Sequence, residues 1–501
     1  MRTLRTRAGR RLPATVLAVA AALLVLSGTA RSAVTPASDH ALPAELRRIL
    51  ASQPLAKANA SVQVLDAESG ASIYAHNPDL MLKPASNLKL VTSAAALSLL
   101  RPEYTFRTWF YATAAPDADG VIHGDLYIKG GGSPGLVGED WWLMARRLRA
   151  LGVARVEGGL VGDDTFFDDV ERGPRWPSSS VDNPYNAPVS ALSCFYNAVA
   201  VTVRPGAPGA RPFVFLEPFD GFFDVSNTAV TSGRGRSLRV SRTWNGKRNV
   251  IQVSGRIGPG EQPWTTYKNV ENPTLYALHA FREAAAREHI EITGESRRGV
   301  VPKDARLIWT HESRPLSHLI HDMNKESNNF MAESVLKTIG AELSGAPGTS
   351  AAGAAAVRSW LRTLGVKTDG IVMVDGSGLS PENRISSDAL ARILLAVHDD
   401  FQAEPEFVAS LPVGGIDGTL DGRMVETPAA RHIRAKTGYI RGVTALSGYA
   451  LNASGKRLVF SVIVNGLGDR VWEGSRSVDR ICEALVQASL PEPAPPAAPG
   501  G

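Results

Sequence analysis

A serine and a lysine three residues apart, Ser86 and Lys89, stand near the start of an apolar segment that runs from Lys83 to Leu97. Its Ala- and Leu-rich pattern predicts a buried helix that opens at Pro84. Residues three apart share one face of a helix, and burial lowers the pKa of a lysine. A lysine that is partly neutral can accept the proton of a serine hydroxyl, so this spacing predicts a serine nucleophile that needs no histidine.

Two further short motifs carry groups that could assist such a nucleophile. Ser327 and Asn329 form an S-x-N motif before a helical pattern, and on its own this polar run is equally typical of a helix N-cap. Lys436, Thr437 and Gly438 form K-T-G on an expected strand that starts an antiparallel meander. A glycine at that position would let the backbone of a ligand approach closely.

The three motifs in this order are the signature of penicillin-binding proteins and class A β-lactamases, and the sequence resembles these penicillin-recognising serine enzymes. Ser327 follows Ser86 by 241 residues (327 − 86). Because a typical connection has only ~4–6 residues, whole domains must be inserted between them. With this insertion, the chain resembles the D-alanyl-D-alanine carboxypeptidase/endopeptidase family of the penicillin-binding protein 4 type, from about residue 42 to 488. Local matches to that family lie at residues 124–134, 162–167, 185–193, 375–380 and 417–420.

The resemblance implies acyl transfer through a serine ester. Ser86 would attack the carbonyl of a D-Ala-D-Ala-type bond in a peptidoglycan stem peptide, with Lys89 as the general base. Ser327 would pass the proton to the leaving amine, and Lys436 would keep that region positive. Water would then hydrolyse the acyl-enzyme, whereas a β-lactam would acylate Ser86 and be released slowly.

The resemblance also implies how the substrate is bound. Asn329 would hold its backbone amide and Thr437 its terminal carboxylate, while the backbone N–H groups of Ser86 and Tyr439 would bind the oxyanion. The family usually has Ser or Thr directly after K-T-G, and the tyrosine found here would favour endopeptidase over carboxypeptidase action. In the inserted part, Asp163 would help to grip a diaminopimelate-type side chain. No cofactor and no metal ion are implied.

The elements around the motifs predict an α+β fold, in which a β-lactamase/transpeptidase-like domain is interrupted by two nested, mainly β domains. Strands at 61–65 and 72–76 can join strands at 443–452 and 457–465 in one antiparallel sheet built from both parts of the chain. Flanking helices include one expected over Leu316–Ile339. The predicted boundaries are 40–105 and 306–490 for the catalytic domain, 106–178 and 262–305 for the second domain, and 179–261 for the nested β domain.

The N-terminal segment of the chain predicts export. An Arg-rich start, an apolar run from Ala14 to Leu26 and small residues after it predict a signal peptide at 1–33. The run is shorter than the ~20 residues of a membrane-spanning helix, which favours cleavage over a retained anchor. Residues 491–501 are typical of a disordered tail. The protein is thus expected in the periplasm or cell envelope, with at most peripheral membrane contact.

Composition narrows the remaining functions. Among 501 residues, 44% are hydrophobic, and the net charge of +5 comes from intermixed acidic and basic residues, which gives no stripe for nucleic acid. Cys194 and Cys482 are too few for a zinc-ribbon or iron–sulfur design; export permits a disulfide, but the domain organisation favours two separate buried thiols. Two other functions stay open: a β-lactamase with a deacylating carboxylate such as Asp375, and a catalytically weak envelope-binding or scaffolding protein.

Overall fold

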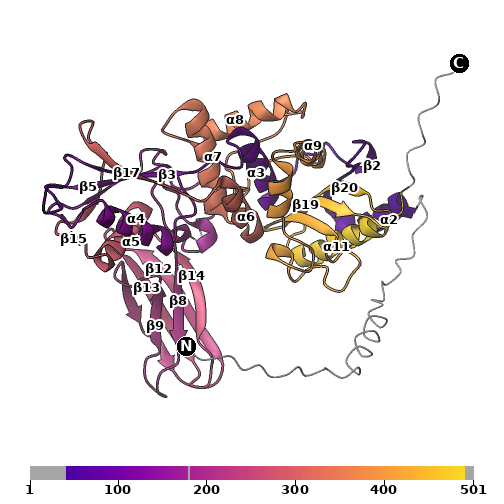
Figure 1. Cartoon of the computed structure of the whole chain (residues 1–501). Helices are drawn as coiled ribbons and strands as arrows, with labels where there is room; N and C mark the ends of the chain where they lie inside the picture. Colours follow the sequence, from indigo (N-terminus) through magenta and orange to yellow (C-terminus); the bar gives the residue numbers. More distant parts are fainter. Residues whose placement is uncertain (1–40, 179–180, 491–501) are drawn as a thin grey trace, which may run out of the picture.

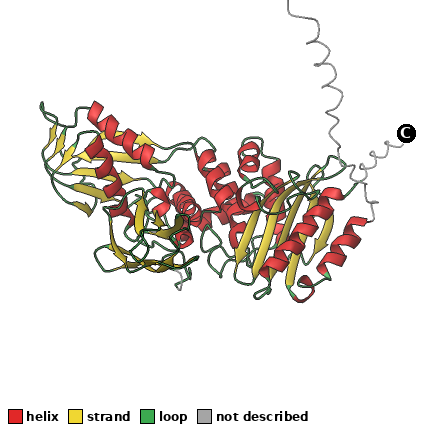
Figure 2. Ribbon diagram, turned by 90° about the horizontal axis from the view of Figure 1, so that it is seen from below, coloured by secondary structure: helices red, strands yellow, loops and turns green. Residues whose placement is uncertain are grey.

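The computed structural model describes residues 41–178 and 181–490, which form two lobes (Figure 1). One lobe holds an antiparallel five-stranded sheet with helices on both faces, and the other holds several sheets, one of them also five-stranded, with helices beside them (Figure 2). The expected signal peptide (1–33) and tail (491–501) lie outside the described residues. In the part of the chain that the structure describes, no helix is long and apolar enough to cross a membrane.

The five-stranded sheet is antiparallel throughout, and its strand order is β18-β19-β20-β1-β2. β1 (Asn59–Asp66) and β2 (Ser72–His76) come from the start of the described chain, and β18 (Ile433–Ile440), β19 (Val443–Leu451) and β20 (Arg457–Asn465) come from its last part. The prediction of one sheet built from both parts of the chain is therefore confirmed. β18 is an edge strand, so one row of its backbone groups points away from the sheet.

Helices cover both faces of this sheet (Figure 2). One face packs against α2 (Ala41–Leu50) and α11 (Val471–Gln487), and the other against α3 (Leu88–Leu99) and α9 (Ser387–His398). Alternate residues of β20 belong to the two opposite cores. Burial on both faces explains why β19 and β20 read as nearly continuous apolar runs in the sequence.

A break between two helices corrects one expectation. The sequence predicts a single helix over Leu316–Ile339, but the structure has α6 (Leu316–Glu326) and α7 (Asn329–Ser344). Ser327 ends α6 with a left-handed φ of 56°, and the Asn328 side chain caps α7 by accepting a hydrogen bond from a backbone N–H of its first turn (3.1 Å). The S-x-N motif is therefore a turn, which the apolar periodicity on either side of it conceals.

Two more helices complete this lobe. α8 (Ser350–Thr363) lies close to the helix that the sequence pattern predicts over Gly353–Leu364, and the short α10 (Glu404–Ser410) follows α9. Short 3₁₀ turns connect the larger elements, and two of them matter for the site: η2 (Ala85–Asn87) directly precedes α3, and η5 (Gly418–Leu420) precedes β18.

The chain between α3 and α6 forms the second lobe. Its described residues include α4 (Gly138–Ala150) and α5 (Pro273–Arg287), which lie close to the helices that the sequence pattern predicts over Glu139–Leu151 and Thr274–Glu288. The strands of its largest sheet, in the order β16-β7-β5-β3-β17, are β16 (Ser296–Arg298), β7 (Leu160–Asp163), β5 (Leu126–Gly130), β3 (Arg107–Ala112) and β17 (Arg306–Glu312). A small parallel sheet joins β15 (Glu291–Ile292), β6 (Arg155–Val156) and β4 (Val121–Ile122).

A strand-rich region extends from the second lobe (Figure 1). Its strands are β8 (Ala198–Arg204), β9 (Phe213–Glu217), β10 (Phe223–Asn227), β11 (Val230–Thr231), β12 (Arg236–Trp244), β13 (Asn249–Ile257) and β14 (Trp264–Asn269). Because β14 pairs with β8, this region continues beyond residue 261. Cys194 lies in the core of the second lobe and Cys482 in the core beneath α11, and both thiols are buried and free.

Candidate active site

The turn that carries Ser86 is strained and tightly packed. Ser86 lies in η2, and Ala85 before it has a left-handed φ of 49°, which a residue other than glycine adopts only at a cost. Gly378 (φ 80°) passes so close that a Cβ on it would lie 1.8 Å from the Ala85 carbonyl oxygen. Backbone from two distant segments therefore fixes the direction of the serine side chain.

Lys89 lies in the first turn of α3, is fully buried and contacts this serine directly. Its Nζ is 2.9 Å from Ser86 Oγ, 2.6 Å from Asn329 Oδ1 and 2.8 Å from the Ser377 carbonyl oxygen. The structure thus brings together the first motif, the second motif and the loop after α8.

The protonation state of Lys89 determines whether it can act as a base. Burial lowers the pKa of Lys89 to about 7, although the negative charges of Asp375 and Glu333 oppose the shift. The ammonium form donates three hydrogen bonds and has no lone pair. The neutral amine keeps two donors for its two other acceptors and gains a lone pair that can take the Ser86 hydroxyl proton.

Lys436 of β18 is the second buried lysine of the site. Its Nζ donates hydrogen bonds to Ser327 Oγ (2.8 Å) and to the Thr437 carbonyl oxygen (3.1 Å). Burial lowers the pKa of Lys436 well below its usual range, and the charge of Lys89 adds to this effect. Their mutual repulsion disfavours the state in which both lysines are charged.

Asn329, the first residue of α7, joins Lys89 to the second lobe. Its Oδ1 accepts the hydrogen bond from Lys89, and its Nδ2 donates one to the Tyr185 carbonyl oxygen (2.9 Å). A side-chain amide has two N–H donors and two acceptor lone pairs. One of each can therefore still serve the backbone amide of a substrate.

The K-T-G strand passes directly alongside the Ser86 turn. A Cβ on Gly438 would lie 2.5 Å from the Pro84 carbonyl oxygen, so glycine lets β18 come this close. The sequence predicts that this glycine makes room for the backbone of a ligand, whereas in the structure the protein's own chain at Pro84 fills the space.

Two side chains of β18 lie where the strand meets the expected substrate. The Thr437 hydroxyl donates a hydrogen bond to Thr419 Oγ1 (2.8 Å), which belongs to η5 and to the family match at 417–420. Tyr439 is two residues further on the same face of the strand, and its side chain is 52% exposed.

A buried loop built around Asp375 supports the serine and the lysine. Asp375 accepts hydrogen bonds from the backbone N–H groups of Ser377 (3.0 Å), Gly378 (2.7 Å) and Ser380 (2.8 Å). It also accepts one from Trp176 Nε1 of the second lobe (2.9 Å). The loop that touches both Ala85 and Lys89 is thus organised around one carboxylate.

Glu333 of α7 is a residue of the site that the sequence did not predict. It is 1% exposed and accepts hydrogen bonds from the Gly376 N–H (2.7 Å) and the Ser350 hydroxyl. Burial and, to a lesser degree, the charge of Asp375 raise the pKa of Glu333 to about 7. Its only signal in the sequence is an acid flanked by apolar residues near the start of α7.

Asp163 lies apart from the three motifs, at the end of β7. It is fully buried, and its partners are Lys129 (3.1 Å), Thr165 and the Val301 N–H (2.9 Å), all within the second lobe. Burial alone would raise the pKa of Asp163, but these hydrogen bonds hold it below its usual value. The structure therefore does not join Asp163 to the serine–lysine cluster.

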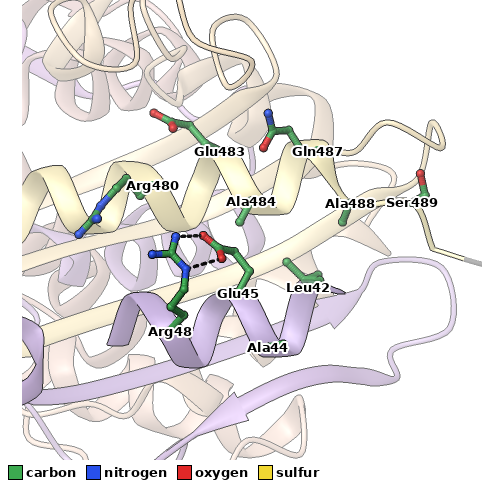
Figure 3. Close-up of a pocket in the computed structure, with 10 residues that line it drawn as sticks. All are labelled: Leu42, Ala44, Glu45, Arg48, Arg480, Glu483, Ala484, Gln487, Ala488 and Ser489. Atoms are coloured by element: carbon green, nitrogen blue, oxygen red, sulfur yellow. Dashed lines mark hydrogen bonds and ion pairs between the residues drawn. The ribbon is translucent and has the colours of Figure 1, made fainter. Parts of the chain in front are cut away.

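A cavity of about 550 Å³ opens between the lobes beside the second motif, lined by residues that include Asn328, Met331, Tyr196 and Tyr267. Another, of about 600 Å³, lies between α2 and α11, where Arg48 and Glu45 form an ion pair (Figure 3). No motif residue lines the second cavity. Among the described residues there is no cluster of His, Cys, Asp and Glu that could hold a metal ion.

This arrangement, a serine hydrogen-bonded to a lysine of near-neutral pKa beside an edge strand, places the protein among the serine enzymes that form acyl intermediates without a histidine base. The chain belongs to the D-Ala-D-Ala carboxypeptidase 3 (S13) family, whose model matches residues 42–484. The resemblance stated from the motifs is thereby confirmed.

Similar proteins agree with this assignment. The chain is 36% identical over 471 residues to a D-alanyl-D-alanine carboxypeptidase of Actinomadura sp., covering 91% of this chain and 85% of the relative. It is 26% identical to the D-alanyl-D-alanine carboxypeptidase DacB of Haemophilus influenzae, covering 78% and 82%. The crystal structure of penicillin-binding protein 4 from that organism superposes with a TM-score of 0.76 at 23% identity, covering 88% of this chain and 98% of that one, which confirms the α+β fold with inserted domains.

Proposed function

We propose that the protein hydrolyses D-Ala-D-Ala-type bonds of peptidoglycan stem peptides through an acyl-enzyme on Ser86. The observation that carries this proposal is the 2.9 Å contact between Ser86 Oγ and the Nζ of Lys89, a buried lysine whose pKa is about 7. The carboxypeptidase names of the relatives from Actinomadura and Haemophilus supply the substrate class.

In the proposed acylation step, neutral Lys89 takes the Ser86 proton as Oγ bonds to the carbonyl carbon. The oxyanion lies against the backbone N–H groups of Ser86 and Tyr439, the kind of preorganised donors that supply a large share of catalysis. Collapse of the tetrahedral intermediate breaks the C–N bond, and the proton that Lys89 took from Ser86 passes to the leaving amine through Ser327, which is hydrogen-bonded to Lys436. Water then attacks the ester carbonyl, and one water proton passes through Lys89 to Ser86 Oγ as the C–O bond breaks and the product acid leaves.

The second motif and the K-T-G strand would bind the two ends of the scissile unit. Asn329 has one N–H and one lone pair left for the substrate amide, and Thr437, supported by Thr419, would meet the terminal carboxylate. Tyr439 supplies no small hydroxyl for that carboxylate, which favours endopeptidase cleavage of cross-links over removal of a terminal D-Ala. Such substrates place the protein in the cell envelope, in line with the expected signal peptide.

Asp163 stays a prediction as a contact for a diaminopimelate-type side chain. The Asp163 carboxylate is buried behind Lys129. A substrate would therefore have to contact Asp163 by way of that lysine. Asp163→Asn should therefore raise KM for diaminopimelate-containing peptides while the kcat for a peptide without that side chain stays unchanged. An equal effect on both peptides would contradict the assignment.

One assay separates the candidate functions. The purified protein is incubated with a muropeptide ending in D-Ala-D-Ala and with a cross-linked dimer, and D-Ala and monomer are quantified, with Ser86→Ala as the control. Release of either product by the wild type alone supports the proposal, and the ratio of the two rates gives the carboxypeptidase-to-endopeptidase balance. Stoichiometric trapping of one β-lactam fits a peptidase, whereas rapid turnover would indicate a β-lactamase. Absence of every product and of trapping would indicate a scaffolding protein.

A further inference from the structure

Two exposed aromatic side chains lie together at the end of the K-T-G strand. Tyr439 of β18 is 52% exposed and Trp472, at the start of α11, is 69% exposed. Their ring centroids are 5.5 Å apart, and the ring planes are inclined by 36°. We call Tyr439 and Trp472 the aromatic pair.

The aromatic pair adjoins the substrate-binding part of β18. Side chains two residues apart on a strand share a face and are separated by ~6.6 Å, so the Tyr439 ring follows Thr437 on the side expected to bind the carboxylate. That carboxylate belongs to the leaving part of the substrate. The pair therefore borders the leaving-group end of the site.

Neither ring is needed for the core of the protein. Large aromatic side chains contribute most when they are buried, yet both rings leave half or more of their surface in solvent. Exposed apolar surface that continues a binding site marks an interaction surface. Arg441, exposed in the turn after β18, adds positive charge that complements an anionic polymer.

We propose that the aromatic pair binds a sugar ring of the glycan strand that continues from the leaving peptide. This inference rests on the proposed function, because it takes peptidoglycan as the substrate. The C–H face of a pyranose ring is flat and matches an aromatic surface, whereas stem peptides offer mainly small methyl groups and charged groups. The pair thus selects polymeric, sugar-bearing substrate over free peptide, which accounts for a tyrosine at the position where the family resemblance implies Ser or Thr.

The test compares polymer with peptide. Trp472→Ala should lower the initial cleavage rate on intact peptidoglycan by about fivefold, a typical value for one aromatic contact. Rates on a sugar-free stem peptide and acylation by a fluorescent penicillin should stay unchanged. Phe401→Ala, which removes a 91% exposed ring from the loop between α9 and α10, is the matched control and should have no effect. An unchanged rate on the polymer, or an equal loss on both substrates, would overturn the proposal.

Binding can be measured without catalysis. Saturation-transfer NMR with a peptide-free glycan oligosaccharide should give signals for the wild type and for Phe401→Ala, and none for Trp472→Ala. If sugar-free stem peptide gives the Trp472-dependent signal instead, the pair is a peptide subsite and the proposal fails. Because this readout does not need turnover, a wild-type protein that releases no D-Ala and cleaves no cross-link would refute the proposed function, while the glycan titration would still decide the role of the pair.

Discussion

The Lys89 amine contacts three oxygen atoms and can donate to only two of them once it is neutral. This count identifies the Ser86 hydroxyl as the partner that changes from acceptor to donor. Burial supplies the neutral population, and the carboxylates of Asp375 and Glu333 limit how far the pKa falls. The pKa of Lys89 is therefore set by two opposing effects: burial lowers it, and the two neighbouring negative charges raise it.

Removing the amine should abolish acylation while the fold remains. Lys89→Ala is expected to reduce labelling by a fluorescent penicillin by about 10²–10⁴-fold, the usual contribution of a positioned general base. Circular dichroism should show unchanged secondary structure, and Ser86→Ala should give no labelling at all. Labelling of Lys89→Ala at the wild-type rate would exclude Lys89 as the base.

The acylation rate should depend on pH in a defined direction. Only neutral Lys89 can act as the base, so kcat/KM is expected to rise with pH through about 7. In Glu333→Gln, a negative charge that raises the pKa of Lys89 is absent, so the acidic limb should move to lower pH. Stopped-flow acylation across pH 5–9 would measure it. If Glu333→Gln is slower but its acidic limb stays at the same pH as in the wild type, Glu333 only supports the Gly376 backbone.

Among the elements, periodicity predicted apolar strands such as β19 and β20, and it placed helices close to α4, α5 and α8. It missed the break at Ser327 because apolar residues recur on both sides of it, and a left-handed residue leaves no periodic signal. It also placed Ser86 on a helix, where the structure has the 3₁₀ turn η2. Both departures lie at positions proposed to be catalytic, where local sequence preference is overridden by tertiary contacts.

The close passage of β18 past η2 gives a prediction at this scale. In Gly438→Ala the new methyl group meets the Pro84 carbonyl, a backbone atom that cannot turn aside. The strand must move off the Ser86 turn, so penicillin acylation should fall by more than about tenfold, with a stability loss of about 1–3 kcal/mol as for overpacking. Gly260→Ala, where a Cβ meets nothing within 4 Å, is the matched control and should acylate normally. Normal acylation by Gly438→Ala would contradict this view of the contact.

In the whole molecule, the motif order and the 241-residue gap (327 − 86) predicted the family and the inserted domains. The contacts between the lobes could not be predicted, since they join residues far apart in sequence that only the folded chain brings together. Trp176 and Asp375 are 199 positions apart, and Tyr185 and Asn329 are 144 apart. The motifs therefore predict the candidate catalytic groups but not the residues that support them.

The contact of Trp176 with Asp375 should help to hold the lobes together. Trp176→Phe removes the Nε1–H donor and leaves a buried carboxylate with one partner fewer, which should cost about 1–3 kcal/mol. Urea unfolding followed by circular dichroism would show this as a lower midpoint. Trp142→Phe, which removes an indole hydrogen bond to Glu288 at an exposed site, is the control and should change the midpoint little. Equal midpoints for the two variants would contradict the structural role of Trp176.

The hydrogen bond from Asn329 to the Tyr185 carbonyl has a mechanical consequence. Three consecutive hydrogen bonds run from Tyr185 through Asn329 and Lys89 to Ser86. A shift of the second lobe that pulls on Tyr185 turns the Asn329 amide and withdraws one of the two acceptors that the neutral amine needs. Activation of the proposed nucleophile would therefore depend on the position of the second lobe.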